Sequence, residues 1–252
     1  GGSNVGGGTV TDVVGFAAAL YKGGTPYLRI PSTFVGIIDA GIGIKVGVNF
    51  KDHKNFIGAY YPPLASLNDV TFLDTLPERE ICCGLSEAIK MALIKDRKLF
   101  ELIESHYRDL FEKNFNKETD EIIERSISTM LEELQPNLRV GNVRRLPDFG
   151  HDFGHIVEAL SEYKLPHGEA VAIGMAISCY LAYLKGMFSG KELKRTLNLL
   201  LAAGLPIYDA CCDAAVLWEK ISKEVIAHKG GKLYLVVPSE IGTGTFIDNL
   251  DE

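Results

Sequence analysis

The chain has 252 residues, of which 46% are hydrophobic and 23% charged, and its formal net charge is −7. These proportions are ordinary for a folded globular protein with one large or two modest domains. The negative charge argues against nucleic acid or an anionic membrane as the main partner. No apolar run approaches the roughly 20 residues of a membrane-spanning helix, and no signal peptide is visible, which favours a cytoplasmic protein.

The cysteines form two adjacent pairs and one single residue: Cys82, Cys83, Cys179, Cys211 and Cys212. This spacing is no disulfide framework, and reduced core thiols in the cytosol explain it better. Metal binding by cysteine is not expected, because no C-x-x-C spacing occurs.

The first part of the chain mixes short β-rich runs with turns. It opens on GGSNVGGG, where a strand should already deliver the backbone to the glycine turn, so we expect a chain without its first strand–helix units. A helix is predicted over residues 12–22, strands over 26–31 and 64–68, and a helical turn that ends at Leu76. This alternation is typical of an α/β domain.

From Pro77 onward the apolar residues repeat with the period of a helix. Helices are predicted at 77–95, 97–113, 118–138, 149–162, 168–186, 190–203 and 213–225, and strands at 232–238 and 245–247. The sequence therefore predicts two domains. Residues 1–76 form the later part of a parallel-sheet α/β nucleotide-binding domain, and residues 77–252 form a mainly helical domain.

Two glycine-rich segments stand in the first part. Backbone N–H groups at Gly6-Gly7-Gly8 would let a pyrophosphate approach the start of the following helix, where Asp12 would cap or hold a hydroxyl. The spacing is not G-x-G-x-x-G, so a plain tight turn is an equal alternative. Further on, glycines in IIDAGIGIKVGVNFKDHKN make a regular helix poor and predict a shaped loop, in which Lys45 can reach an anion.

Three residues of metal-binding type stand far apart: Glu87 in GLSEAIK, His151 in DFGHDFGH and His167 in LPHGEAVA. Two imidazoles and one carboxylate are the ligand set of an open catalytic site for zinc or a similar divalent ion. A nucleotide site in one half and a metal in the other suggest redox chemistry on a polyol.

Each of these residues also has a plainer interpretation. Glu87 and Lys90 stand at i, i+3 and could be a solvated ion pair. His151 and His155 could be a core or surface pair on one helix face with Glu158. His167 could be only a turn residue. The three ligand types together are far more specific than any one of them.

Taken together, these segments resemble the sugar phosphate cyclases, the group that contains dehydroquinate synthase and the sedoheptulose 7-phosphate cyclases. The resemblance runs from GGGTVTDVVGFAA through IPSTFVGIIDAGIGIKVGVNF, HKNFIGAYYPP, TFLDTLPERE, GLSEAIK and DFGHDFGH to HGEAVA. It implies an NAD-binding domain and then a helical metal-binding domain, in a usually dimeric enzyme that uses NAD and zinc or cobalt.

The resemblance also implies roles at matching positions. The metal ligands would be Glu87, His151 and His167. The residues that contact NAD would be Gly8, Thr9, Val10, Thr11, Asp12, Ser32, Thr33, Lys45, Lys54, Phe72, Leu73, Asp74 and Thr75. The catalytic and substrate-binding residues would be Asp39, Lys45, Asn55, Lys90, Arg144, Asp148, His155 and Lys229.

Within this group the residues favour a cyclase of sedoheptulose 7-phosphate. Dehydroquinate synthase has asparagine where this chain has Asp148, and a lysine for the substrate carboxylate where this chain has Gln135. We therefore expect a carbon–oxygen lyase that eliminates phosphate and forms a C7 cyclitol of the valiolone type. His155 resembles the 2-epi-valiolone branch, since 2-epi-5-epi-valiolone synthases usually carry proline there, and the product stereochemistry stays open.

Three alternatives stay open. One is 3-dehydroquinate synthase, and a second is a metal-dependent polyol dehydrogenase, which would accumulate NADH and release no phosphate. The third is an inactive remnant. It is suggested by the start of the chain and by Gly23, which stands where the family has an arginine that reaches the phosphate of the neighbouring subunit.

Overall fold

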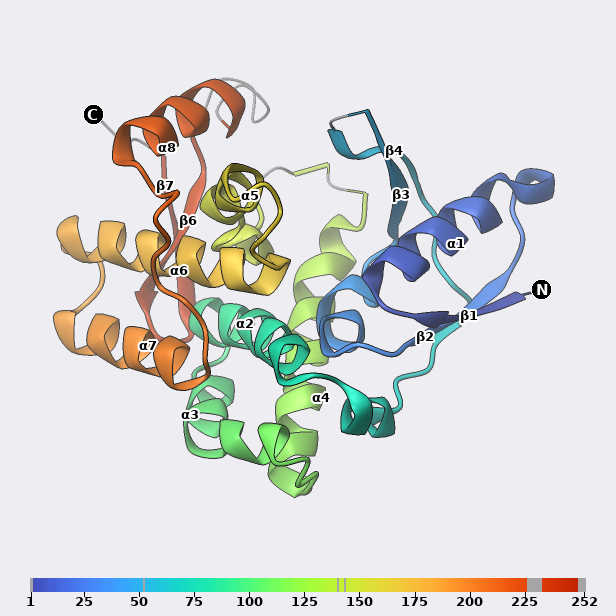
Figure 1. The fold of residues 1–252 in the computed structure, drawn as a ribbon, viewed down its shortest axis with the longest axis horizontal. Coiled ribbons are helices and arrows are strands. Elements are labelled where there is room, and N and C mark those ends of the chain that lie inside the picture. The colour runs from blue at the N-terminus through green and yellow to red at the C-terminus, as the bar shows by residue number, and fades with distance from the viewer. Residues whose placement is uncertain (1, 52, 140, 143, 226–232, 249–252) are drawn as a thin grey trace.

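The computed structural model describes residues 2–51, 53–139, 141–142, 144–225 and 233–248. The protein is an α/β structure with a parallel sheet in its first part and a large helical part after it, as the sequence predicted. Figure 1 shows the two parts side by side, with strands β1 and β2 on one side and helices α6 and α7 on the other.

The parallel sheet has the strand order β1-β2-β5, with β1 over Gly2–Gly6, β2 over Tyr27–Pro31 and β5 over Ala65–Ser66. Helix α1, Gly8–Leu20, and the 3-10 turn η1, Tyr21–Gly23, form the crossover from β1 to β2. Strand β1 was not predicted, because its glycine-rich sequence has no apolar alternation. Its pairing with β2 supplies the backbone hydrogen bonds instead.

The predicted loop over residues 37–55 is wrong for most of its length. A π-helical turn, η2 at Gly36–Ala40, is followed by a hairpin of β3, Lys45–Phe50, and β4, His53–Tyr60. The glycines that suggested a loop are where the two strands come close: a Cβ on Gly47 would lie 2.9 Å from the carbonyl oxygen of Ile57. Among the described residues of this segment, the turn between η2 and β3 and Lys51 between the two strands are irregular.

Each helix predicted after residue 76 is present within a few residues. The helices are α2 at Glu78–Ile94, α3 at Arg97–Phe111, α4 at Lys117–Leu134, α5 at His151–Leu160, α6 at His167–Leu184, α7 at Gly190–Ala202 and α8 at Ala214–Lys220. The short turns are η3 at Val70–Thr75, η4 at Gln135–Asn137, η5 at Leu146–Asp148 and η6 at Ile221–Val225. Strands β6, Leu235–Glu240, and β7, Thr243–Ile247, form an antiparallel hairpin.

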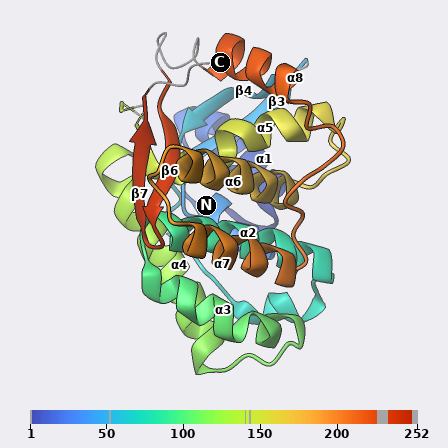
Figure 2. The ribbon, with the colours of Figure 1, turned by 90° about the vertical axis from the view of Figure 1, so that its left-hand side faces the viewer.

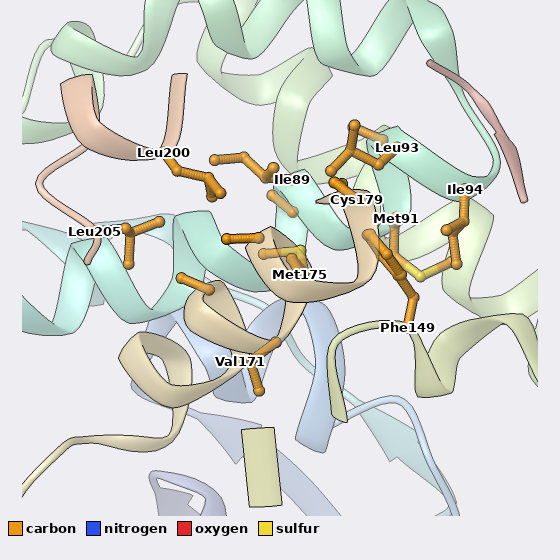
Figure 3. Close-up of a cluster of buried hydrophobic side chains, with 14 of the residues drawn as sticks. Ile89, Met91, Leu93, Ile94, Phe149, Val171, Met175, Cys179, Leu200 and Leu205 are labelled. Carbon is orange, nitrogen blue, oxygen red and sulfur yellow. The ribbon is translucent and has the colours of Figure 1, made fainter. Parts of the chain in front are cut away.

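Helices α2 and α6 form the centre of the helical part. Figures 1 and 2 show α6 between α5 and α2, and both of these helices contact it. Figure 3 shows Ile89 and Leu93 of α2 packed with Met175 and Cys179 of α6 in one hydrophobic cluster. Every residue of α2 from Cys83 to Ile94 is buried, so the polar side chains of Ser86, Glu87 and Lys90 lie in the interior.

Helices α5 and α6 approach each other through glycines. Gly150, which precedes α5, has a φ of 76°, a left-handed conformation that glycine adopts without strain. A Cβ on Gly174 of α6 would lie 1.9 Å from the carbonyl oxygen of Gly150. The absence of a side chain there fixes the close spacing of the two helices.

The change from strands to long helices falls between η3 and α2. The division into domains over 1–76 and 77–252 stays a prediction, because helices of the second part also pack against the first. Lys113, for example, donates hydrogen bonds from Nζ to the carbonyl oxygens of Leu73 (2.7 Å) and Leu76 (2.9 Å). Within the described ranges, no helix is both long and apolar enough to span a membrane.

Substitution of Gly174 by alanine should destabilise the fold, because the new methyl group must push the first turn of α5 away from α6. We expect the free energy of unfolding to fall by about 1–3 kcal/mol. Gly43→Ala is the control, since a Cβ there meets nothing within 4 Å, and it should change stability by at most about 1 kcal/mol. Urea denaturation measures both, and equal effects would contradict the close approach.

Candidate metal and nucleotide site

A buried ion pair on α2 lies at the base of the candidate site. Glu87 and Lys90 are each only 1% exposed, and Lys90 Nζ lies 2.6 Å from Glu87 Oε2. Lys90 Nζ also lies 3.5 Å from Oδ2 of Asp39, at the end of η2. The solvated ion pair considered from the sequence is therefore excluded, because both charged groups are buried inside the protein.

Two histidines at helix starts face the same carboxylate. His151 is the first residue of α5 and His167 the first residue of α6. Their Nε2 atoms lie 3.9 and 3.6 Å from Glu87 Oε1, and their ring centroids are 5.2 Å apart. Helices α2, α5 and α6, which are far apart in the sequence, thus bring one carboxylate and two imidazoles together.

The other nitrogen of each ring has its own acceptor. His151 Nδ1 lies 3.2 Å from the carbonyl oxygen of Phe149, and His167 Nδ1 lies 3.2 Å from Glu158 Oε2. Because a carbonyl and a carboxylate accept, each Nδ1 carries the proton, and each Nε2 presents its lone pair towards Glu87. Such outer partners fix the orientation of imidazole ligands in metal sites.

The donor set fits a divalent metal ion. One ligand atom from each of Glu87, His151 and His167 lies within 4.8 Å of the others. Glu87 Oε1 is buried and, within the described part of the chain, has no hydrogen-bond donor. A buried carboxylate oxygen without a partner is costly, and a cation between these three groups would satisfy it.

A second group could also offer ligands, but it is better explained as support for the first. His155, Glu158 and His167 also have ligand atoms within 4.8 Å of one another. This group shares His167 with the first, and the oxygen of Glu158 that would bind already faces His167 Nδ1. His155 is more than half exposed and lies 3.6 Å from the same oxygen.

Burial and neighbouring charges set the protonation states. Burial raises the pKa of Asp39, whereas burial and then the charge of Lys90 hold the pKa of His151 well below its usual value. For Lys90, burial alone would lower the pKa, but the carboxylates of Asp39 and Glu87 outweigh it and raise the pKa. His151 is therefore neutral and Lys90 cationic at neutral pH, the states suited to metal binding and to hydrogen-bond donation.

Two adjoining cavities open on these groups. One of about 280 Å³ is lined by Asp39, Lys45, Lys90, Arg145 and Asp148, among others. A larger one of about 660 Å³ joins the imidazoles of His151, His155 and His167 to the start of α1. The sequence placed the glycine turn and the metal ligands in different domains, and the structure brings both to one cavity.

The start of α1 is suited to an anion. Residues Gly7, Gly8, Thr9 and Val10 line the larger cavity, and the first turn of the helix contains no acidic residue. The first backbone N–H groups of a helix lack partners within it, so they can donate to a phosphate. A Cβ on Gly7 would lie 2.9 Å from Thr33 Cγ2, so only glycine lets the turn pack this closely.

The other residues implied for NAD and substrate have mixed positions. Asp12, Thr33 and Lys45 line the larger cavity, whereas Thr11, Ser32 and the residues of η3 (Phe72, Leu73, Asp74 and Thr75) line neither cavity. The side chains of Lys54 and Asn55 and the whole of Lys229 lie outside the described residues. Their implied roles stay predictions.

The structure separates two neighbouring arginines. Arg144, which the resemblance implied as a substrate contact, forms two hydrogen bonds of 2.8 and 2.9 Å with Asp248 and lies over the rings of Tyr234 and Phe246. It lines neither cavity. Arg145 does line the smaller one, with its Nη1 3.5 Å from Asp148 Oδ1. No signal in the sequence pointed to Arg145, and the implied role of Arg144 stays a prediction.

Glu158 also went without a role in the sequence analysis. Its position three residues after His155, on the same helix face, was a usable signal. The acceptor role became visible only when α6 brought His167 to within 3.2 Å of its carboxylate.

Comparison with known proteins agrees with this geometry. The family model described as 3-dehydroquinate synthase N-terminal matches residues 3–83, and the model described as 3-dehydroquinate synthase C-terminal matches residues 84–224. A 2-epi-5-epi-valiolone synthase of Streptomyces glaucescens is 43% identical over 248 residues, which are 98% of this chain and 64% of that protein. The chain therefore spans less than two thirds of the length of this relative.

Two further relatives bear on the family. A 3-dehydroquinate synthase of Dictyoglomus thermophilum is 37% identical over 249 residues, 98% of this chain and 69% of that protein. The solved structure of ValA, a 2-epi-5-epi-valiolone synthase from Streptomyces hygroscopicus subsp. jinggangensis 5008 with NAD⁺ and Zn²⁺ bound, has a TM-score of 0.95 and is 41% identical. That comparison covers 99% of this chain and 69% of the other.

Removal of the Glu158 carboxylate should weaken metal binding. In Glu158→Ala, His167 loses the acceptor that orients its ring, and we expect the zinc affinity to fall about 10- to 100-fold. Competition with a chromogenic chelator measures the affinity without any assay of activity. Glu162→Ala is a matched control on an exposed carboxylate nearby and should leave the affinity unchanged, whereas wild-type affinity in Glu158→Ala would contradict the role.

Proposed function

Because the chain belongs to the 3-dehydroquinate synthase family, we propose that it acts as a sugar phosphate cyclase that uses NAD and a divalent metal, zinc or cobalt. The proposed reaction converts sedoheptulose 7-phosphate to a C7 cyclitol of the valiolone type with elimination of phosphate. One observation carries the proposal: Glu87, His151 and His167 converge at a cavity that the glycine turn of α1 also lines. The bound NAD⁺ and Zn²⁺ of the ValA structure support both cofactors.

A metal ion held by Glu87, His151 and His167 would supply a Lewis acid that lowers the pKa of a substrate hydroxyl, and NAD would supply reversible uptake of hydride. Lys90 Nζ, kept cationic by Glu87 and Asp39, would donate a hydrogen bond to a substrate hydroxyl oxygen. Asp39 would accept one from a neighbouring hydroxyl. These two residues would therefore orient the ring of the sugar.

The phosphate of the substrate would lie against cations on the wall of the smaller cavity. Lys45 and Arg145 both line it, and burial and then the charge of Arg145 lower the pKa of Lys45. An anion placed between Lys45 and Arg145 would stabilise the charged form of Lys45. Charge-assisted hydrogen bonds to the departing phosphate would stabilise its growing negative charge.

Support for an uncharged substrate end comes from Asp148. Its carboxylate lies 3.5 Å from Arg145, and the neighbouring wall is apolar, with Leu134, Leu138 and Pro147. With the phosphate against Lys45 and Arg145, a substrate carboxylate on this wall would face apolar side chains and the negative charge of Asp148. The heptulosonate substrate is therefore disfavoured relative to sedoheptulose 7-phosphate.

A second candidate is 3-dehydroquinate synthase itself, which the Dictyoglomus thermophilum relative favours. It would share the metal site, the NAD site and the elimination of phosphate. It would differ in binding a substrate carboxylate in addition to the phosphate. The resemblance to the family further supports a homodimer in the cytoplasm, with the division into domains near Leu76, and we propose these as well.

The proposal predicts phosphate release from sedoheptulose 7-phosphate when NAD and zinc are supplied, with no net accumulation of NADH. Glu87→Gln should abolish release, because a neutral amide is a poor metal ligand, and Glu101→Gln on α3 serves as the control outside the site. Release from the heptulosonate alone would instead support 3-dehydroquinate synthase. Net NADH without phosphate would identify a polyol dehydrogenase, and no turnover with metal bound would identify an inactive remnant.

The two neighbouring arginines provide a matched pair. Arg145→Ala should raise the KM for the sugar phosphate about 10- to 100-fold, since a hydrogen bond to a charged group contributes about 1.5–3 kcal/mol. Arg144→Ala removes an exposed contact with Asp248 and should leave KM within about threefold of wild type. Steady-state kinetics would contradict the assignment if Arg144→Ala had the larger effect on KM.

A further inference from the structure

We propose that Arg29 is a positioning residue that holds Asp39 and Lys45 in place by clamping the turn between them. The expected effect on kinetics rests on the proposed function, and it adds to that function a residue that lines neither of the two cavities. Arg29 lies in β2, the middle strand of the parallel sheet.

The contacts of Arg29 are directed at one turn. Its Nη1 donates hydrogen bonds of 2.8 Å to the carbonyl oxygens of both Gly41 and Gly43. Its Nη2 donates one of 2.9 Å to the hydroxyl of Tyr27, whose ring stacks on Tyr61 with centroids 6.0 Å apart. The planar guanidinium thus spans two carbonyls that stand two residues apart, which an ammonium group does less well.

Arg29 is an unusual residue to bury. Its side chain is 0% exposed. Within the described part of the chain, its Nε has no hydrogen-bond partner and no carboxylate forms an ion pair with it. A buried charge without a counter-ion usually destabilises a fold relative to an apolar residue of similar size. Stability alone therefore explains this arginine poorly, and its carbonyl contacts point to a role in positioning.

The side chains of the clamped turn fix it only in part: Ile42 is half-buried against the hydrophobic core, and both of its neighbours are glycines. A Cβ on Gly41 would lie 2.1 Å from the carbonyl oxygen of Gly36, so the position admits only glycine. Backbone hydrogen bonds also hold the turn, such as Gly41 N–H to Gly36 (2.7 Å) and Ile42 N–H to Asp39 (2.9 Å). Arg29 adds side-chain hydrogen bonds that tie the carbonyl groups of this turn to β2.

The turn separates two residues that line both cavities. Asp39 ends η2 on one side of it, and Lys45 begins β3 on the other. The proposed metal ligands, in contrast, stand on α2, α5 and α6. Loss of the clamp should therefore disturb hydroxyl and phosphate binding while the metal-binding groups stay in place.

The first test uses Arg29→Met, which keeps the length of the side chain and removes its donors. We expect kcat/KM for sedoheptulose 7-phosphate to fall about 10- to 100-fold, with zinc affinity within about threefold of wild type. Arg29→Lys keeps the positive charge but lacks the planar guanidinium, so its kcat/KM should lie between those of the wild type and Arg29→Met. It is the variant to use if Arg29→Met does not fold. Unchanged kcat/KM in both variants would overturn the proposal, as would an equal loss of zinc affinity.

A comparison of double and triple variants tests whether Arg29 acts through Asp39 and Lys45, the residues on either side of the clamped turn. In the background of Asp39→Asn and Lys45→Met, the additional change Arg29→Met should lower kcat/KM by less than about threefold, because the groups it positions are already gone. Full additivity would mean that Arg29 only supports the fold.

Amide hydrogen exchange provides a readout that does not depend on the reaction. In Arg29→Met or Arg29→Lys, a peptide covering residues 39–46 should exchange faster, while peptides from α2 and α6 keep their wild-type rates. Wild-type exchange over 39–46 would overturn the clamp even if the protein were no cyclase. Faster exchange in a protein without turnover would retain the clamp and reject the proposed function.

Discussion

The structure depends on a carboxylate and an ammonium group buried together on one central helix. Glu87 and Lys90 lie one turn apart on α2, which contacts both η2 and α6, and solvent does not reach them. Buried charges are tolerated when they are paired and satisfied by further polar groups. Lys90 has the carboxylates of Glu87 and Asp39, so it is well paired. Glu87 Oε1 lies near the imidazoles of His151 and His167 and, among the described residues, accepts no hydrogen bond, so this oxygen defines the proposed metal site.

Helix starts supply the remaining groups. His151 and His167 are the first residues of α5 and α6, and the close packing of these helices around Gly150 and Gly174 brings the imidazoles together. The start of α1 faces the same cavity from the other part of the chain. Residues that begin helices have side chains near exposed backbone N–H groups and away from the helical core. The later turns of α5 and α6 can therefore pack in the core and hold the two histidines at the edge of a polar cavity, while their own side chains do not fill that cavity.

The sequence predicts most of the helices and the candidate metal ligands. The β3–β4 hairpin and the positions of the arginines could not be predicted, for physical reasons. Helical periodicity predicted α2 to α8, and ligand chemistry singled out Glu87, His151 and His167 before any family was considered. The β3–β4 hairpin was mistaken for a loop, because the glycines that break a helix are the same residues that let two strands approach closely. Arg144 and Arg145 are adjacent, and partners distant in sequence, Asp248 for Arg144 among them, accompany their different positions. The clamp by Arg29 likewise depends on backbone carbonyls, which no sequence pattern reveals.

The central claim is that one carboxylate and two imidazoles bind the catalytic metal. X-ray absorption fine structure at the zinc edge tests it most directly, on the protein loaded with one equivalent of zinc. The account predicts nitrogen and oxygen ligands at about 2.0–2.2 Å, including the scattering pattern of two imidazoles. Cys83 lines the same cavity as His151 and His167, so its sulfur is the nearest competing ligand type, although burial raises the pKa of its thiol to about 12. A zinc–sulfur distance of about 2.3 Å, or the signature of fewer than two imidazoles, would contradict the account.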